Sequence, residues 1–364
     1  MGKLPGCFFF LLFFHQMAFA GEGGIPLDGR DDISPEAFIK TGDSIWEIPE
    51  RIPPFSFDEA IYSWNAPLPG GQGFRLYIKL EFKDKNTSPW LYGGYWGKAK
   101  PRSSDIITTF TLGKIDYDYI KLKKKARTYQ FRVVSEGDIK LSVLPSIRFV
   151  YTDNDPSKQD IQEHAIRFQK LRCPILDIPL RRQEDSTGKY IKGACQSAAL
   201  ASALEYYGKE MKLEDIVDLV YDPEYDLKGI WPRTIGAASQ LGFMGYIDRF
   251  RSWDYVKSVV AQNKVILVSI TMPREGDYVD PPYPVMGGHI VALNGITDDG
   301  RVVVTDSALG KSGRGYRCQW LRPDFVKVWM QNKGGVGMVI CPPDGAQMKE
   351  IKNLPPFESY KNEK

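Results

Sequence analysis

Residues 194–208 read ACQSAALASALEYYG, and this stretch decides the fold of the second half of the chain. Alanine, leucine and glutamate are strong helix formers, and glycine commonly ends a helix. The stretch therefore predicts a helix that begins beside Cys195 and ends at Gly208. Unpaired backbone N–H groups and the helix dipole stabilise negative charge at such a start and lower the pKa of a thiol. Cys195 is thus a candidate nucleophile, the alternative being a buried structural cysteine.

Further elements follow this helix along the chain. Apolar periodicity, a capping serine and a starting proline predict three more helices. They cover residues 213–220, 232–242 and 252–262. Three strongly apolar runs predict strands, at residues 265–270, 289–296 and 301–306. Turn residues 297–300 join the last two strands into a hairpin. Helices followed by antiparallel strands predict an α+β domain over residues 173–343.

The histidine count limits the choice of a base for Cys195. Only three histidines occur, at positions 15, 164 and 289. His15 lies in a predicted targeting segment and His164 in a polar linker, which leaves His289 at the start of a predicted strand. A single histidine at a strand start is usually structural or merely exposed. The neighbouring strand strengthens its candidacy as a base.

Asp306 ends the strand that pairs with the one His289 begins. If Thr297 pairs with Gly300, Asp306 faces Val291, and one step along it faces residue 293. Both registers place Asp306 on the face of His289, because side-chain direction alternates with period two. A three-residue loop would break this parity. The alternative is an aspartate that only stabilises a strand end or a turn.

A thiol, an imidazole and a carboxylate together can perform nucleophilic catalysis at a carbonyl group. The thiolate attacks, the imidazole transfers protons, and the carboxylate holds the imidazole in its useful tautomer. The oxyanion that develops needs hydrogen-bond donors. The backbone N–H of Cys195 is one candidate donor, and the side-chain amide of Gln183 is another.

The region from residue 173 to 342 resembles the bacterial C39-type peptidase-like group, which are papain-fold relatives of cysteine-peptidase family thirty-nine. The matching stretches are residues 178–183, 194–198, 229–232, 288–291 and 304–307. The resemblance implies a papain-like α+β fold. It also implies that Cys195 is the nucleophile, His289 the base, Asp306 its orienting group and Gln183 the oxyanion donor. The sequence departs from the family at residues 196–198, where Gly or Ser and then Pro often follow the cysteine.

Residues 46–153 have a different character from the second half. Short segments such as 74–80 and 129–133 alternate apolar and polar residues, which predicts strands with one buried face. No amphipathic helix is evident, so we expect an antiparallel β-sandwich. This part looks like the β-rich region of exported family members, with 62–65 and 89–92 as the similar pieces. Its aromatic residues either line a surface for a cell-surface polymer or fill the core: Trp64, Trp90, Tyr92, Tyr95 and Trp96.

The N-terminus predicts export. Lys3 precedes an apolar run at residues 8–14, and small residues follow at positions 18 and 20, as in a cleavable signal peptide over residues 1–20. The run is too short for a membrane anchor. We therefore expect a secreted or periplasmic protein that has no membrane contact after cleavage. A flexible lead-in at 21–45 and a tail at 344–364 are predicted to be loosely ordered. The polar segment 154–172 is predicted to be a linker or a short helix that joins the two halves.

Composition narrows the function further. The chain has 364 residues and a net charge of +3, so no excess of positive charge favours nucleic acid. We expect no cofactor, since the sequence has no nucleotide-binding loop and no metal-ligand spacing. If Cys195 is a free thiol, at most one disulfide can form among the remaining cysteines, and its pairing stays open. These are Cys173, Cys318 and Cys341.

The leading hypothesis is an exported cysteine peptidase or related amide hydrolase that acts on a peptide or protein substrate. An acyl transferase could use the same residues, because a thioester intermediate also reacts with amines. A non-catalytic protein that binds a peptide or a polymer is the third hypothesis, motivated by the altered residues after Cys195.

Overall fold

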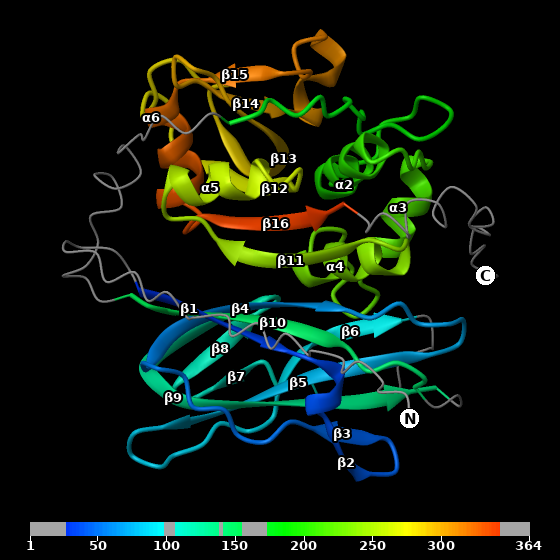
Figure 1. Ribbon diagram of the computed structural model, residues 1–364, viewed down its shortest axis with the longest axis vertical. Coiled ribbons are helices and arrows are strands. Elements are labelled where there is room, and N and C mark those ends of the chain that lie inside the picture. The colour runs from blue at the N-terminus through cyan, green and yellow to red at the C-terminus, as the bar shows by residue number, and fades with distance from the viewer. Residues whose placement is uncertain (1–26, 98–105, 138–140, 155–172, 343–364) are drawn as a thin grey trace, which may run out of the picture.

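The computed structural model describes residues 27–97, 106–137, 141–154 and 173–342. Two antiparallel sheets lie one above the other and belong to the two halves of the chain (Figure 1). The predicted signal peptide, the tail at 344–364 and the linker beyond Asn154, with His164, lie outside the described residues. None of the helices in the described ranges is both long and apolar enough to span a membrane.

The N-terminal half forms a single antiparallel sheet. Its strands are β1 (Leu27–Ile33), β2 (Ile39–Gly42), β3 (Ile45–Glu47), β4 (Phe57–Asn65), β5 (Gly73–Phe82), β6 (Leu91–Gly97), β7 (Thr109–Phe110), β8 (Gly113–Asp116), β9 (Tyr119–Glu136) and β10 (Ser146–Asp153). The long strand β9 pairs with β4 and β8 near its start and with β3 and β5 near its end. Aromatic side chains fill the core beside it, and the rings of Tyr129 and Phe149 lie 4.3 Å apart. The ten strands form one hydrogen-bonded sheet that β9 holds together, and the predicted sandwich of two sheets is not confirmed.

The lead-in predicted at residues 21–45 is wrong for its described part. Strand β1 pairs with β10 along its whole length, and a 3₁₀ turn at Pro35–Ala37 leads into β2. The charged residues that suggested disorder form ion pairs with the second half of the chain. Arg30 contacts Asp248 at 2.7 Å, and Asp28 contacts Arg251 at 3.0 Å.

The second half combines a six-stranded antiparallel sheet with helices. The helices are α2 (Cys195–Tyr206), α3 (Leu213–Val220), α4 (Trp231–Gln240), α5 (Trp253–Val260) and α6 (Arg322–Phe325), with a 3₁₀ helix η3 (Ser307–Ser312) and a π-helix η4 (Val326–Gln331). The strands, in their order across the sheet, are β11 (Met244–Arg249), β16 (Val336–Cys341), β12 (Val265–Met272), β13 (Met286–Ile296), β14 (Val302–Thr305) and β15 (Cys318–Trp320). All four predicted helices and all three predicted strands are present. Strands β11, β15 and β16 were not predicted.

Strand β11 is an edge of this sheet, and side chains of β4 complete its hydrogen bonds. The Gly245 N–H donates to Asn65 Oδ1 at 3.0 Å, and Asn65 Nδ2 donates to the Gly245 carbonyl at 2.9 Å. The Ile247 N–H donates to Ser63 Oγ at 3.0 Å. The two halves therefore meet through a sheet edge whose backbone groups are satisfied, as buried polar groups require.

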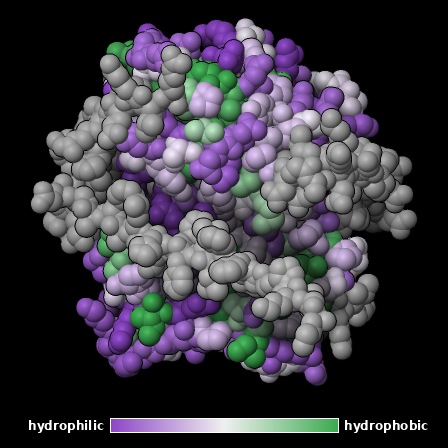
Figure 2. Space-filling model, in the orientation of Figure 1, coloured by the Kyte–Doolittle hydropathy of each residue, from purple (hydrophilic) through white to green (hydrophobic). Residues whose placement is uncertain are grey.

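The aromatic residues of the N-terminal half also belong to this interface and to the core. Four of the five named above are buried: Trp64, Tyr92, Tyr95 and Trp96. A Cβ atom at Gly236 in α4 would lie 2.9 Å from both Trp64 and Trp96, so only glycine lets the helix pack this closely. The fifth, Trp90, is partly buried under the guanidinium of Arg132, at 3.9 Å. The four buried residues therefore fill the core, which was one of the two alternatives for these positions. The face of the molecule in Figure 2 is mostly hydrophilic, with scattered apolar residues.

Candidate active site

Cys195 is the first residue of α2, as predicted. The residue before the helix, Ala194, has no side chain that can cap the helix, so the first N–H groups have no side-chain acceptor from that position. Gly193 enters the helix with φ of 76°, a left-handed conformation that favours glycine. Helix α2 packs against β13, and this contact brings Cys195 beside His289.

Gln196 anchors the start of α2 to α4. Its side chain is buried, and Nε2 donates to the Ile230 carbonyl at 3.0 Å and also to Thr234 Oγ1. The N–H of Trp231, at the start of α4, donates in turn to Asp118 Oδ2 of the N-terminal half at 2.7 Å. The departure from the family pattern after Cys195 therefore has a structural role, since Gln196 joins the nucleophile's helix to the domain interface.

His289 and Asp306 are in direct contact. Nε2 of His289 lies 2.7 Å from Asp306 Oδ1, and both side chains are buried. The carboxylate also accepts from the Ala308 N–H at 2.8 Å, which caps η3, and from the Tyr283 hydroxyl at 3.2 Å. Because Nε2 is engaged by Asp306, Nδ1 is the ring nitrogen left for the thiol of Cys195.

The contact between His289 and Asp306 arises from two irregularities that cancel. Thr297 N–H donates to the Arg301 carbonyl, so the hairpin has the three-residue loop that would break the predicted parity. A bulge between Leu293 and Gly295 then shifts the register back by one residue. Thr305 pairs with Ala292. Extending this register by one residue on each strand sets Asp306 opposite Val291, as in the first predicted register.

The pKa shifts at the site are those of a thiolate beside an imidazolium. Burial lowers the pKa of His289, but hydrogen bonds to Asp306 and Cys195 outweigh it and raise the pKa to about 9. Burial raises the pKa of Cys195, but the hydrogen bond and charge of His289 lower it below its ordinary value overall. Each group thus favours the charged form of the other.

Gln183 lies at the same site, where its buried side chain donates from Nε2 to Ser307 Oγ at 3.1 Å. An amide nitrogen carries two hydrogens, so one remains for another acceptor. Sequence reasoning identified Gln183 but missed Ser307 and Tyr283. Ser307 follows Asp306 directly in a matching stretch, which was a usable signal. Tyr283 lies in a loop whose sequence carries no motif.

Comparisons with known proteins bear on the two halves separately. Residues 175–336 match the model of the Peptidase_C39 like family, and residues 40–149 match that of the Peptidase C39 N-terminal domain. The second half of the chain is a C39-like peptidase domain. A solved structure of the peptidase domain of Streptococcus ComA, a bi-functional ABC transporter involved in a quorum sensing pathway, is 14% identical with a TM-score of 0.29. The match covers 45% of this chain and 98% of that one. No curated protein matches the chain.

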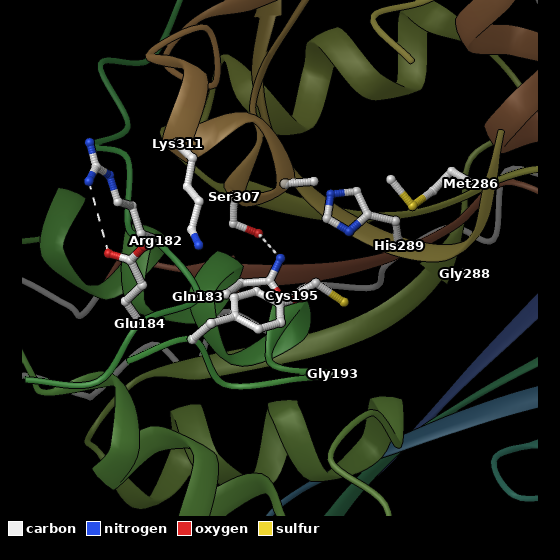
Figure 3. Close-up of a pocket in the computed structure, with 12 residues that line it drawn as sticks. Arg182, Gln183, Glu184, Gly193, Cys195, Met286, Gly288, His289, Ser307 and Lys311 are labelled. Atoms are coloured by element: carbon white, nitrogen blue, oxygen red, sulfur yellow. Dashed lines mark hydrogen bonds and ion pairs between the residues drawn. The ribbon is translucent and has the colours of Figure 1, made fainter. Parts of the chain in front are cut away.

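The C39-like domain has a pocket of about 300 Å³ at the candidate site (Figure 3). All of the predicted site residues except Asp306 line it, and Asp306 lies behind His289. The lining residues are Arg182, Gln183, Glu184, Tyr190, Gly193, Cys195, Met286, Gly288, His289, Ser307, Ala308 and Lys311. The pocket therefore holds a nucleophile, a base and an amide donor together, as acyl transfer to a thiol requires.

The other cysteines of the C39-like domain do not resemble Cys195. Cys173 and Cys318 are free thiols, so no two of Cys173, Cys318 and Cys341 are joined as a disulfide. Burial raises the pKa of Cys173, and burial together with the charge of Asp306 raises that of Cys318 to about 11. Within the described ranges, no three His, Cys, Asp or Glu side chains are grouped to hold a metal ion. The family and the site together support a cysteine peptidase.

Proposed function

We propose that the C39-like domain is a papain-like cysteine peptidase or related amide hydrolase, with Cys195, His289, Asp306 and Gln183 as its catalytic residues. The observation that carries the proposal is the 2.7 Å contact between His289 Nε2 and Asp306 Oδ1. Because this contact engages Nε2, Nδ1 of His289 is the ring nitrogen left for the thiol of Cys195 at the start of α2. The predicted signal peptide supports action outside the cytoplasm on peptide or protein substrates.

The proposed reaction proceeds through a thioester. The Cys195 thiolate attacks the carbonyl carbon of the scissile amide and forms a C–S bond. The carbonyl oxygen becomes an oxyanion, which accepts hydrogen bonds from the Cys195 N–H and the Gln183 amide. The imidazolium of His289 then protonates the leaving nitrogen, and the C–N bond breaks. Water, deprotonated by His289, attacks the thioester, the C–S bond breaks, and a carboxylic acid leaves.

Alkylation of Cys195 tests the ion pair without a known substrate. The rate of iodoacetamide labelling is measured against pH by peptide mapping in wild type and His289→Ala. The pKa of Cys195 is lowered and that of His289 is raised, so we expect fast labelling of wild type at pH values well below the ordinary thiol pKa of about 8.5. This fast labelling at low pH should be lost in His289→Ala. Cys318 in the same protein is an internal control that should react only at high pH.

Turnover tests the reaction itself. Cys195→Ala should abolish cleavage of a peptide library that wild type cleaves, and unchanged cleavage would refute the proposal. Adding an amine acceptor distinguishes hydrolysis from acyl transfer, since a transferase would give amide products. Labelling at Cys195 that follows an ordinary thiol and does not change in His289→Ala would favour the binding-protein hypothesis.

A further inference from the structure

Two positively charged side chains line the pocket without a role in the proposed mechanism, Arg182 and Lys311. Lys311 lines it from η3, and in the described part of the chain its ammonium group makes no ion pair. The ammonium lies 5.6 Å from the centre of the Tyr190 ring, a cation–π contact with another lining residue. The charge that stabilises the Cys195 thiolate comes from His289. Lys311 is therefore available to a ligand.

The other charges on this side of the pocket compensate each other. Arg182 Nη1 lies 3.9 Å from Glu184 Oε2, and this pair is drawn in Figure 3. The side chain of Arg182 packs against η3, since a Cβ at Gly310 would lie 3.0 Å from its Cγ. In Figure 3 the Lys311 side chain extends from η3 on the same side of the pocket as this pair. One positive charge thus remains unmatched at the pocket wall.

We propose that Lys311 makes the pocket favour substrates with a carboxylate group beside the bond that is cleaved. This inference rests on the proposed function and adds a substrate class to it. A pocket of about 300 Å³ is roughly as wide as the Debye length of about 8 Å at physiological salt. Salt therefore only partly screens the charge of Lys311 from a ligand in the pocket. Lys311 is exposed to solvent, so its attraction for an anion is strongest at low salt. The carboxylate is either an acidic side chain or the free C-terminus of a peptide.

Two alkylating reagents that differ in charge test this inference at Cys195. Iodoacetate carries a carboxylate, and iodoacetamide is its neutral counterpart. The ratio of their labelling rates at Cys195 reports the attraction for a carboxylate, and changes in the reactivity of the thiol cancel. We expect Lys311→Met to lower this ratio by about threefold to tenfold at low salt. Lys311→Arg should preserve it, and added salt should reduce the difference between wild type and Lys311→Met.

A matched lysine provides the control. Lys264 also lies near a tyrosine ring, at 6.0 Å from that of Tyr246, but it does not line the pocket. Lys264→Met should leave the ratio unchanged. The iodoacetamide rate of each variant shows whether the site is intact. An unchanged ratio in Lys311→Met, with a normal iodoacetamide rate, overturns the inference. At about pH 9 even an ordinary thiol reacts, so the ratio is measurable whether or not Cys195 is activated.

Peptide pairs distinguish the two sources of the carboxylate. One pair exchanges Asp or Glu for Asn or Gln at each position near the cleaved bond, and the other exchanges a C-terminal acid for an amide. The preferred source should show a higher kcat/KM in wild type, and this preference should be lost in Lys311→Met. Cleavage without any charge preference refutes the inference and leaves the peptidase. A Lys311-dependent ratio without cleavage of any peptide refutes the peptidase and leaves the carboxylate site.

Discussion

Asp248 at the domain interface and Asp306 at the active site are both completely buried, and each accepts a hydrogen bond from a tyrosine hydroxyl. Their other partners differ. Asp248 lies 2.7 Å from Arg30 and 3.5 Å from Arg148, whereas Asp306 lies 2.7 Å from the imidazole of His289. The two carboxylates therefore share burial and a tyrosine donor but not the chemistry of their other partners.

The difference lies in whether the partner can change its charge. A guanidinium stays protonated at every ordinary pH, so the pairs at Asp248 are fixed links between the two halves. An imidazole gains and loses a proton near neutral pH, so the pair at Asp306 can change during a reaction. Burial of an aspartate alone therefore does not identify a catalytic site. A titrating partner beside a nucleophile does.

Asp306→Asn should give the largest effect, a loss of activity. Asparagine fills the same volume, but it removes the negative charge that raises the pKa of His289. We expect kcat/KM to fall by about 10²- to 10⁴-fold, the range of general acid–base catalysis. Fast labelling of Cys195 should also move to higher pH. A kcat/KM within threefold of wild type would show that the carboxylate charge is not needed.

Asp248→Asn should give the converse result, with lost stability and retained activity. It removes the charge that balances Arg30 and Arg148 at a buried position, and breaking such a pair costs about 3 kcal/mol of unfolding free energy. Asp32→Asn is the matched control. Asp32 pairs with the same Arg148 at 2.7 Å but its side chain is 70% exposed, so its loss should cost at most about 1 kcal/mol. Denaturant unfolding measures both variants, and equal losses would contradict the assignment of Asp248 as a buried link.

Much of the active site could be predicted because its residues sit in strong local patterns. The helix formers after Cys195 and the apolar runs around His289 and Asp306 specify their elements without help from the rest of the chain. The contact between His289 and Asp306 was also predicted, but the hairpin has a loop that alone would separate them. The bulge at Asn294 restores the parity, and its side chain bonds Leu176 and Thr305, which are contacts that no local pattern reveals.

The N-terminal half was harder to predict because its sequence signals describe contacts with the other half. The charges of β1 resembled a loose segment, yet Arg30 forms an ion pair with Asp248, more than two hundred residues away. The aromatic residues left two alternatives open, a binding surface or a core, and the packing of Trp64 and Trp96 on α4 at Gly236 decides for the core at these positions. In the second half, strand β16 lies between β11 and β12 although it follows all the other described strands in the sequence, so its pairing also depends on distant partners.

Replacing the two tyrosines that donate to these aspartates should have smaller effects than replacing the aspartates themselves. Tyr283 donates to Asp306 at 3.2 Å and Tyr255 to Asp248 at 2.6 Å, so phenylalanine removes one hydrogen bond in each region. A hydrogen bond to a charged group contributes about 1.5–3 kcal/mol, and the longer bond should lie at the low end. We expect Tyr283→Phe to lower kcat by about tenfold with little change in KM, since Asp306 holds His289 less firmly.

Tyr255→Phe should instead lower the unfolding free energy by about 2 kcal/mol and leave kcat unchanged, because Asp248 has no contact with the pocket. Steady-state kinetics and denaturant unfolding on both variants form a two-by-two comparison. Loss of kcat in Tyr255→Phe would mean that the domain interface positions the catalytic residues. Loss of stability alone in Tyr283→Phe would mean that Asp306 orients His289 without help from that hydroxyl.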